Sequence, residues 1–230
     1  MGLDWLDWTL PANLSVHRGG IDETYYIILA ITGLAFVLVE AGILWFVFRY
    51  RSREGREAHY THGNDRLELI WTAIPALVVV LLGIRSGGLW ADIKAPDAYP
   101  EDALTLDVRA KQFEWHFDYR GPDGEPGTGD DFSVRNHLHV PADRPVVVRL
   151  ESEDVIHSFA IPEFRVKQDA VPGMTTTTWF EAAEPAEVEL GCAELCGLGH
   201  YRMSAEVTVH PPGEFEAWRA EQAAEAEESG

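Results

Sequence analysis

The chain has 230 residues, and its 38 acidic against 18 basic side chains give a formal net charge of −20. This charge excludes a nucleic-acid-binding protein, which needs a basic face, and 46% hydrophobic residues exclude a disordered chain. The chain has only two cysteines, too few for a disulfide framework.

The negative charge is concentrated in the second part of the chain. Residues 1–90 hold 9 acidic and 7 basic side chains, whereas residues 91–230 hold 29 and 11. Only three of the basic residues are lysine. An acidic, lysine-poor surface favours solubility in concentrated salt, so we expect a halophilic source, with an ordinary acidic secreted domain as the alternative.

The first part of the chain predicts a transmembrane helical hairpin over residues 25–90, after a short N-terminal segment, 1–24, outside the membrane. Tyr25 to Phe48 is apolar except for Glu40, and at ~1.5 Å per residue it crosses a hydrocarbon layer of ~30 Å. The second apolar segment, 69–84, reaches full length if Arg85 extends toward the interface. Because a charge at mid-membrane is costly against lipid, we expect Glu40 to face a partner helix.

Charges set the predicted orientation of this hairpin. The loop 49–66 between the two segments carries five arginines, whereas Arg18 is the only basic residue in the first 24. The positive-inside rule therefore places the loop in the cytoplasm and both chain ends on the outer face of the cell membrane.

The second part predicts an all-β domain, a β-sandwich or Greek-key barrel, over residues 103–212 after a Pro- and Asp-rich linker, 91–102. Seven or so runs alternate polar and apolar residues, separated by Pro, Gly and Asp turns. The acidic insert 121–131 is interpreted as a hairpin loop, because its spacing does not fit a calcium-binding EF-hand. The tail 213–230 favours one or two helical turns followed by a solvated acidic end.

A potential metal site lies near the end of this domain. Cys192, Cys196, His200 and Met203 follow one another with the spacing Cys-x3-Cys-x3-His-x2-Met. Two thiolates, an imidazole and a thioether are soft ligands that select copper over hard cations. The second thiolate implies a disulfide or a second, sulfur-bridged metal; structural zinc is the other alternative.

Two coppers need a second imidazole. His157, in EDVIHSFAIPEF, is the best candidate. His137 and His139 compete for this role, although their i, i+2 spacing is typical of ordinary surface packing on a strand.

The chain resembles subunit II of the haem–copper terminal oxidases, the cytochrome c oxidase family, over nearly its whole length. The segments that carry the resemblance are RLELIWTAIPAL, VIHSFAIP, KQDAVPGM, CAELCGLGHYRM and the final EFEAW. The resemblance implies a cupredoxin-like fold and a binuclear CuA centre. Together with the acidic, lysine-poor surface, it leads us to expect a halophilic archaeon as the source.

The resemblance also implies roles for individual residues. Cys192 and Cys196 would bridge two coppers, His157 and His200 would each cap one, and Met203 and the backbone carbonyl of Glu194 would be weak axial ligands. The side chain of Glu194 would bind Mg²⁺ or Mn²⁺ at the junction with subunit I.

Three further residues have implied roles in electron or proton transfer. Electrons would enter at the aromatic segment that holds Phe113 and Trp115, although many relatives have Trp at the position of Phe113. As i, i+2 neighbours on one strand, both rings are expected on the same face, at the surface or in the core. Glu68, at the cytoplasmic edge of the second helix, would serve a proton-uptake entrance.

These observations predict a subunit at which single electrons enter a proton-pumping oxidase, pass to haem in subunit I and reduce O2 to water. Further membrane subunits and a small copper protein or cytochrome c as donor are the expected partners. Two alternatives remain: a membrane-tethered copper module without an oxidase, for which one helix would suffice, and the CuA subunit of a nitric oxide reductase.

Overall fold

The structure is a computed structural model that describes residues 9–16, 18–57, 59–95, 98–121, 124–125 and 127–229. The chain divides into two compact units: a helical unit, Gly20–Asp92, and a β-rich unit that includes segments from both sides of it. Residues 1–8 of the expected N-terminal segment lie outside the described residues.

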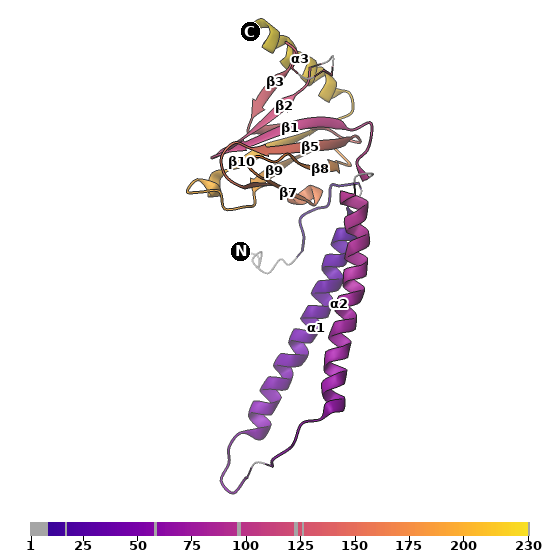
Figure 1. Cartoon of the computed structure of the whole chain (residues 1–230), viewed down its shortest axis with the longest axis vertical. Coiled ribbons are helices and arrows are strands. Elements are labelled where there is room, and N and C mark those ends of the chain that lie inside the picture. The colour runs from indigo at the N-terminus through magenta and orange to yellow at the C-terminus, as the bar shows by residue number, and fades with distance from the viewer. Residues whose placement is uncertain are drawn as a thin grey trace. The chain divides into compact units, whose positions relative to one another are not determined.

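The helical unit is a hairpin of α1 (Gly19–Tyr50) and α2 (Asp65–Lys94), drawn in Figure 1. Each helix is long and apolar enough to cross a membrane, and no part of either apolar stretch is buried within the chain. The two predicted apolar helices are therefore confirmed, and their exposed apolar surface suits the interior of a membrane. Because α2 continues to Lys94, the first residues of the expected linker are helical.

Polar contacts join the two helices. Arg85 Nη2 of α2 lies 2.7 Å from Glu23 Oε2 of α1, and Arg85 Nε donates a hydrogen bond to Thr24 Oγ1 at 3.0 Å. The sequence predicts only that Arg85 extends toward the membrane interface. Its partners on α1 are distant in sequence, so the pattern of residues does not indicate them.

The β-rich unit contains two five-stranded sheets with the strand orders β3-β2-β1-β5-β8 and β4-β10-β9-β6-β7. Most neighbouring strands are antiparallel, but β1 pairs with β5 and β4 with β10 in parallel. This two-sheet, all-β architecture is the predicted cupredoxin-like fold class. The strands are β1 (Leu104–Lys111), β2 (Glu114–Tyr119), β3 (Phe132–Arg135), β4 (His137–Pro141), β5 (Pro145–Ser152), β6 (His157–Ile161), β7 (Val166–Ala170), β8 (Thr176–Glu181), β9 (Ala186–Cys192) and β10 (Ser204–His210).

The core lies between the two sheets and follows the alternation of the strands. In β1 every second residue is buried, beginning with Leu104 and Leu106, and in β2 the buried set is Trp115, Phe117 and Tyr119. Buried residues of both sheets join in one cluster. The period of two in the sequence therefore identified core-facing side chains correctly.

The structure has more strands in its described residues than the sequence predicts. The run FSVRNHLHV is broken at Asn136, which has a positive φ of 54° and separates β3 in one sheet from β4 in the other. The segments of β6 and β7 are not among the predicted alternating runs. β6 is buried on nearly every residue and so does not alternate.

The N-terminal segment is attached to the β-rich unit. The backbone N–H of Leu14 donates to the carbonyl of Glu163 at 2.9 Å, and the carbonyl of Leu14 accepts from Ala183 N at 2.8 Å. Arg18 is only 3% exposed, donates to the carbonyl of Trp179 and packs over its ring. Burial lowers the pKa of Arg18 to about 10.

The C-terminal tail forms a longer helix than the one or two turns expected. Helix α3 runs over Glu214–Ser229. Phe215 joins the core of the β-rich unit, and Trp218 packs against it. Packing of these two aromatic residues supplies the stability that the acidic sequence alone lacks.

Three histidines lie beside α3. His139 Nδ1 and His210 Nε2 lie 2.8 Å apart, the rings of His137 and His139 have centroids 4.0 Å apart, and Trp218 stacks on His139 at 4.1 Å. Burial, with His137 and His210 nearby, lowers the pKa of His139 to about 3. His139 therefore stays neutral at neutral pH.

Lowering the pH from 7 to 5 should weaken the docking of α3. When α3 is undocked, His139 is exposed and takes up a proton below about pH 6.5, whereas docked His139 does not until about pH 3. The undocked state therefore binds more protons between these pH values, and the free energy of docking becomes less favourable as the pH falls. One proton accounts for at most ~1.4 kcal/mol per pH unit. Hydrogen exchange of α3 amides in the full-length chain in detergent measures this, after correction for the intrinsic pH dependence of exchange.

The variant His139→Phe keeps an aromatic ring against Trp218 and should reduce the pH dependence. His116→Gln, in β2 and paired with Glu114, is the matched control and should retain it. Equal pH dependence in both variants would contradict this account.

Candidate metal centre

Strand pairing brings the two halves of the candidate metal centre together. His157 begins β6 and Cys192 ends β9, and these strands are antiparallel with Phe159 opposite Cys192. The segment after β9 returns through the short helix η4 (His200–Arg202) to β10. The backbone N–H of Cys192 donates to the carbonyl of Met203 at 3.0 Å and closes this loop.

The ligand atoms converge on the two sulfurs. Cys192 Sγ and Cys196 Sγ lie 3.8 Å apart. His157, Cys192 and Cys196 offer ligand atoms that all lie within 4.8 Å of one another. His200 Nδ1 lies 3.6 Å from Cys196 Sγ, so each sulfur has an imidazole beside it.

Two weaker candidate ligands also lie close to the sulfurs. Met203 Sδ is 3.1 Å from His157 Nδ1 and 3.7 Å from Cys196 Sγ. The carbonyl oxygen of Glu194 is 3.2 Å from Cys192 Sγ. Two thiolates, two imidazoles, a thioether and a carbonyl form a donor set that fits copper.

Asp154, which the sequence analysis missed, orients one imidazole. Its Oδ1 lies 2.8 Å from His157 Nε2, which leaves Nδ1 directed toward the sulfurs. A carboxylate that fixes the second nitrogen of a histidine is a recurrent feature of metal sites. The only feature of the sequence that could have indicated this role of Asp154 is its position three residues before His157.

The two thiols differ in acidity. Burial opposes ionisation of Cys192, but hydrogen bonds from His157 and from backbone groups outweigh it and lower its pKa to about 6. Burial and the neighbouring Cys192 raise the pKa of Cys196 to about 11. A bound cation would favour ionisation of both thiols.

Phe113 and Trp115 both pack on the core of the β-rich unit, so of the two predicted positions, surface or core, the structure has the core. Phe113 lies in the turn between β1 and β2, which breaks the alternation, and is half-buried. Trp115 is fully buried, with its ring 6.2 Å from that of His157. Trp115 therefore cannot contribute to a surface patch.

Phe113 also packs against the backbone of the metal-binding loop, residues 193–203 between β9 and β10. A Cβ added at Gly199 would lie 2.4 Å from the Phe113 ring, so only glycine fits there. Arg202 packs over the same ring. The contact places an aromatic side chain next to His200.

The competing histidines lie elsewhere. His137 and His139 belong to the cluster beside α3, where His137 Nε2 is 2.9 Å from Thr208 Oγ1. Neither joins the group formed by His157 and the two cysteines.

The remaining predicted site residues are exposed acids. The side chain of Glu194 belongs to no three-ligand group among the described residues. Glu68 lies in the first turn of α2, after the cap formed by Asn64, whose Oδ1 accepts the backbone N–H groups of Arg66 and Leu67. Glu40 is exposed within this chain, so any partner helix must belong to another subunit.

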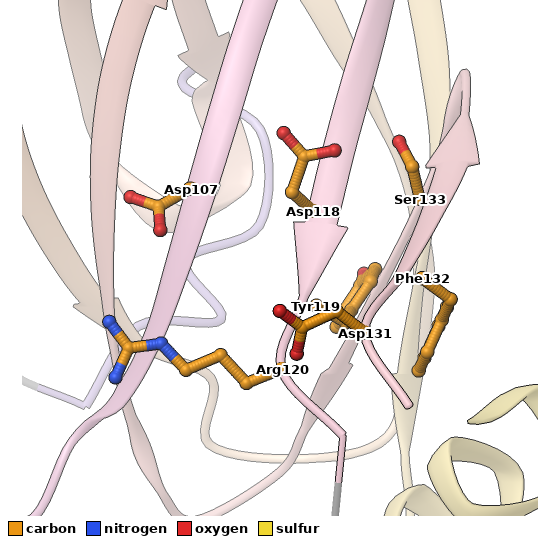
Figure 2. Close-up of a pocket in the computed structure, with 7 residues that line it drawn as sticks. All are labelled: Asp107, Asp118, Tyr119, Arg120, Asp131, Phe132 and Ser133. Atoms are coloured by element: carbon orange, nitrogen blue, oxygen red, sulfur yellow. The ribbon is translucent and has the colours of Figure 1, made fainter. Parts of the chain in front are cut away.

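A surface hollow of about 310 Å³ lies on β1–β3, away from the candidate metal centre (Figure 2). Its carboxylates have partners: Asp118 pairs with Arg109 at 2.7 Å, Asp107 with Arg149 at 3.3 Å, and Asp131 accepts the N–H of Gly121. These contacts agree with a structural loop rather than a calcium site.

Comparison with known proteins identifies relatives of both units. Residues 5–89 match the family "Cytochrome C oxidase subunit II, transmembrane domain", and residues 122–209 match "Cytochrome C oxidase subunit II, periplasmic domain". The alternative cytochrome c oxidase subunit 2 of Bradyrhizobium diazoefficiens is 34% identical over 94% of this chain and 84% of its own. Cytochrome c oxidase subunit 2 of Thermostichus vulcanus is 34% identical over 91% of this chain and 77% of its own. The solved periplasmic domain of cytochrome oxidase subunit II from Bradyrhizobium japonicum covers 55% of this chain and 96% of its own, with 33% identity and a TM-score of 0.48.

Proposed function

Because the chain belongs to the cytochrome c oxidase subunit II family, and is thus part of a haem–copper terminal oxidase, we propose that its copper centre is a binuclear CuA site. The observation that carries this proposal is the pair of sulfurs 3.8 Å apart with one imidazole beside each. When bound, the centre accepts and releases one electron at a time.

The residues of this chain would hold the centre as follows. Cys192 and Cys196 would supply the two thiolates, and His157 and His200 the two imidazoles. The closeness of Met203 Sδ to His157 Nδ1, and of the Glu194 carbonyl to Cys192 Sγ, supports both as additional weak ligands. Asp154 holds the His157 ring, and the closed loop limits movement when charge changes. We further propose that the Glu194 carboxylate binds Mg²⁺ or Mn²⁺ together with subunit I.

In this proposal the subunit receives single electrons from an external donor and passes them to haem in subunit I of a proton-pumping oxidase, where O2 is reduced to water. The N-terminal segment and the β-rich domain lie on the outer face of the cell membrane, and the loop 49–66 lies in the cytoplasm. The domain boundaries 1–24, 25–90, 91–102, 103–212 and 213–230 remain our predicted division. Two long apolar helices support assembly with other membrane subunits rather than a simple tether, which needs one.

The full-length chain in detergent should bind two coppers that share one unpaired electron. Copper analysis and electron paramagnetic resonance test this; a single isolated copper or one zinc would reject the binuclear proposal. Cys196→Ser should lose the shared-electron signature. Met203→Leu should alter the spectrum, whereas the matched control Met174→Leu, at an exposed methionine, should not.

The donor is proposed to dock on the metal-binding loop. Leu195, Leu198 and Tyr201 are 78%, 97% and 86% exposed, and Phe113 packs beneath this loop. The acidic surface would steer a basic donor at low salt, but at 1 M salt the Debye length is only ~3 Å. In the proposed halophilic archaeal source, docking must rest on apolar contact, so we propose a small copper protein rather than a cationic cytochrome c.

The rate of reduction by such a copper protein should stay flat or rise as salt increases to multimolar, and Leu198→Ser or Tyr201→Ser should lower it about tenfold. Tyr60→Ser, at an exposed tyrosine of the loop between the helices, is the control and should leave it unchanged. A steep fall in rate with salt, and a basic cytochrome as the best donor, would overturn the proposal.

Glu68 is proposed to serve proton uptake from the cytoplasm. An acid in the first turn also stabilises a helix by ~0.3–1 kcal/mol through the helix dipole, so the two roles need separating. Glu68→Gln should slow turnover of the assembled oxidase several-fold without changing the copper spectrum. Asp65→Asn, in the same turn, is the control, and unchanged turnover in Glu68→Gln would leave only the dipole role.

A further inference from the structure

The turn between β1 and β2 contacts both halves of the metal centre through Gln112. The side-chain Nε2 of Gln112 donates to the carbonyl of Cys196 at 2.6 Å. Its backbone N–H donates to Asp154 Oδ2 at 2.7 Å, and Asp154 Oδ1 lies 2.8 Å from His157 Nε2. One residue is thus linked to a thiolate ligand on one side and to an imidazole ligand on the other.

The backbone of the metal-binding loop has few other hydrogen bonds to the rest of the β-rich unit. Among the described residues, the Gln112 contact is the only hydrogen bond from outside the loop to the backbone between Glu194 and Gly199. The bonds from His200 N to Gly197 O and from Arg202 N to Gly199 O lie within the loop. Leu198 is almost fully exposed and cannot anchor the loop by packing.

The loop is built to let Gln112 approach. Gly197, directly after Cys196, has a φ of 134°, which side chains rarely allow. A Cβ at this position would lie 2.7 Å from Gln112 Nε2. Glycine here frees the backbone and makes room for the amide, but it also leaves the Cys196–Gly197 peptide flexible unless something holds it.

We propose that Gln112 is a positioning residue that fixes the Cys196 carbonyl and, through Asp154, the His157 ring, so that both sides of the copper pair keep one geometry. This inference rests on the proposed CuA function. Gln112 touches no ligand atom of the metal, and it acts through the Cys196 backbone and through Asp154. Outer contacts of this kind typically change metal affinity 10- to 100-fold when they are removed.

The test uses the full-length chain in detergent with Gln112→Met, which keeps the length of the side chain and removes the donor. We expect copper to pass to a chelator about tenfold faster than from the wild type, and a changed copper hyperfine splitting. Gln112→Glu, which places a carboxylate against the Cys196 carbonyl, should lose copper faster still. Gln222→Met, the same change in α3, is the control and should behave as wild type.

A copper-free measurement separates this inference from the proposed function. Amide exchange over Gly197–Met203 in copper-free chain should be faster in Gln112→Met than in the wild type or in Gln222→Met. If the wild type fails to hold two coppers, the proposed function is wrong, and the exchange comparison still tests Gln112. Unchanged exchange together with unchanged copper loss would overturn the role of Gln112.

Discussion

The pairing of β6 with β9 is the constraint on which the metal centre depends. These strands are distant in sequence, and their antiparallel register sets Phe159 opposite Cys192, which brings His157 beside the first thiol. The pairing of β9 with β10 then returns the chain so that Met203 lies over the same sulfurs. A slip of one residue in either register would turn a ligand to the opposite face of the sheet.

The sequence predicts the candidate ligands but not the residues that position them. Cys192 to Met203 lie close in sequence on one loop, so their spacing alone indicates a soft-metal site. Asp154 and Gln112 act through contacts between separate strands and turns, and no pattern in the chain reports such contacts. The turn at Phe113 has the same origin, because period-two alternation holds only while a strand continues, and β1 ends at Lys111.

Tertiary packing also overrode local composition at both ends of the β-rich unit. The acidic tail is a poor candidate for a stable isolated helix, yet Phe215 and Trp218 give it an apolar face that the sheet covers. The N-terminal segment has no strand pattern, yet the backbone of Leu14 bonds on both sides to the β-rich unit. In each case the determining contacts are long-range, and sequence patterns report local ones.

The metal-binding loop is held in place on its inner side and exposed to solvent on its outer side. A centre that exchanges electrons gains from ligands that do not move, and the interior side of the loop supplies this through the two strand pairings and the contacts to Gln112 and Phe113. The outer side presents Leu198 and Tyr201 to solvent. Exposing single apolar residues is ordinary, but three on one short loop beside a metal site favour contact with a partner. Because the loop is short, a protein docked on Leu198 and Tyr201 would lie close to the two sulfurs. The same backbone segment can therefore serve both docking of a partner and electron transfer.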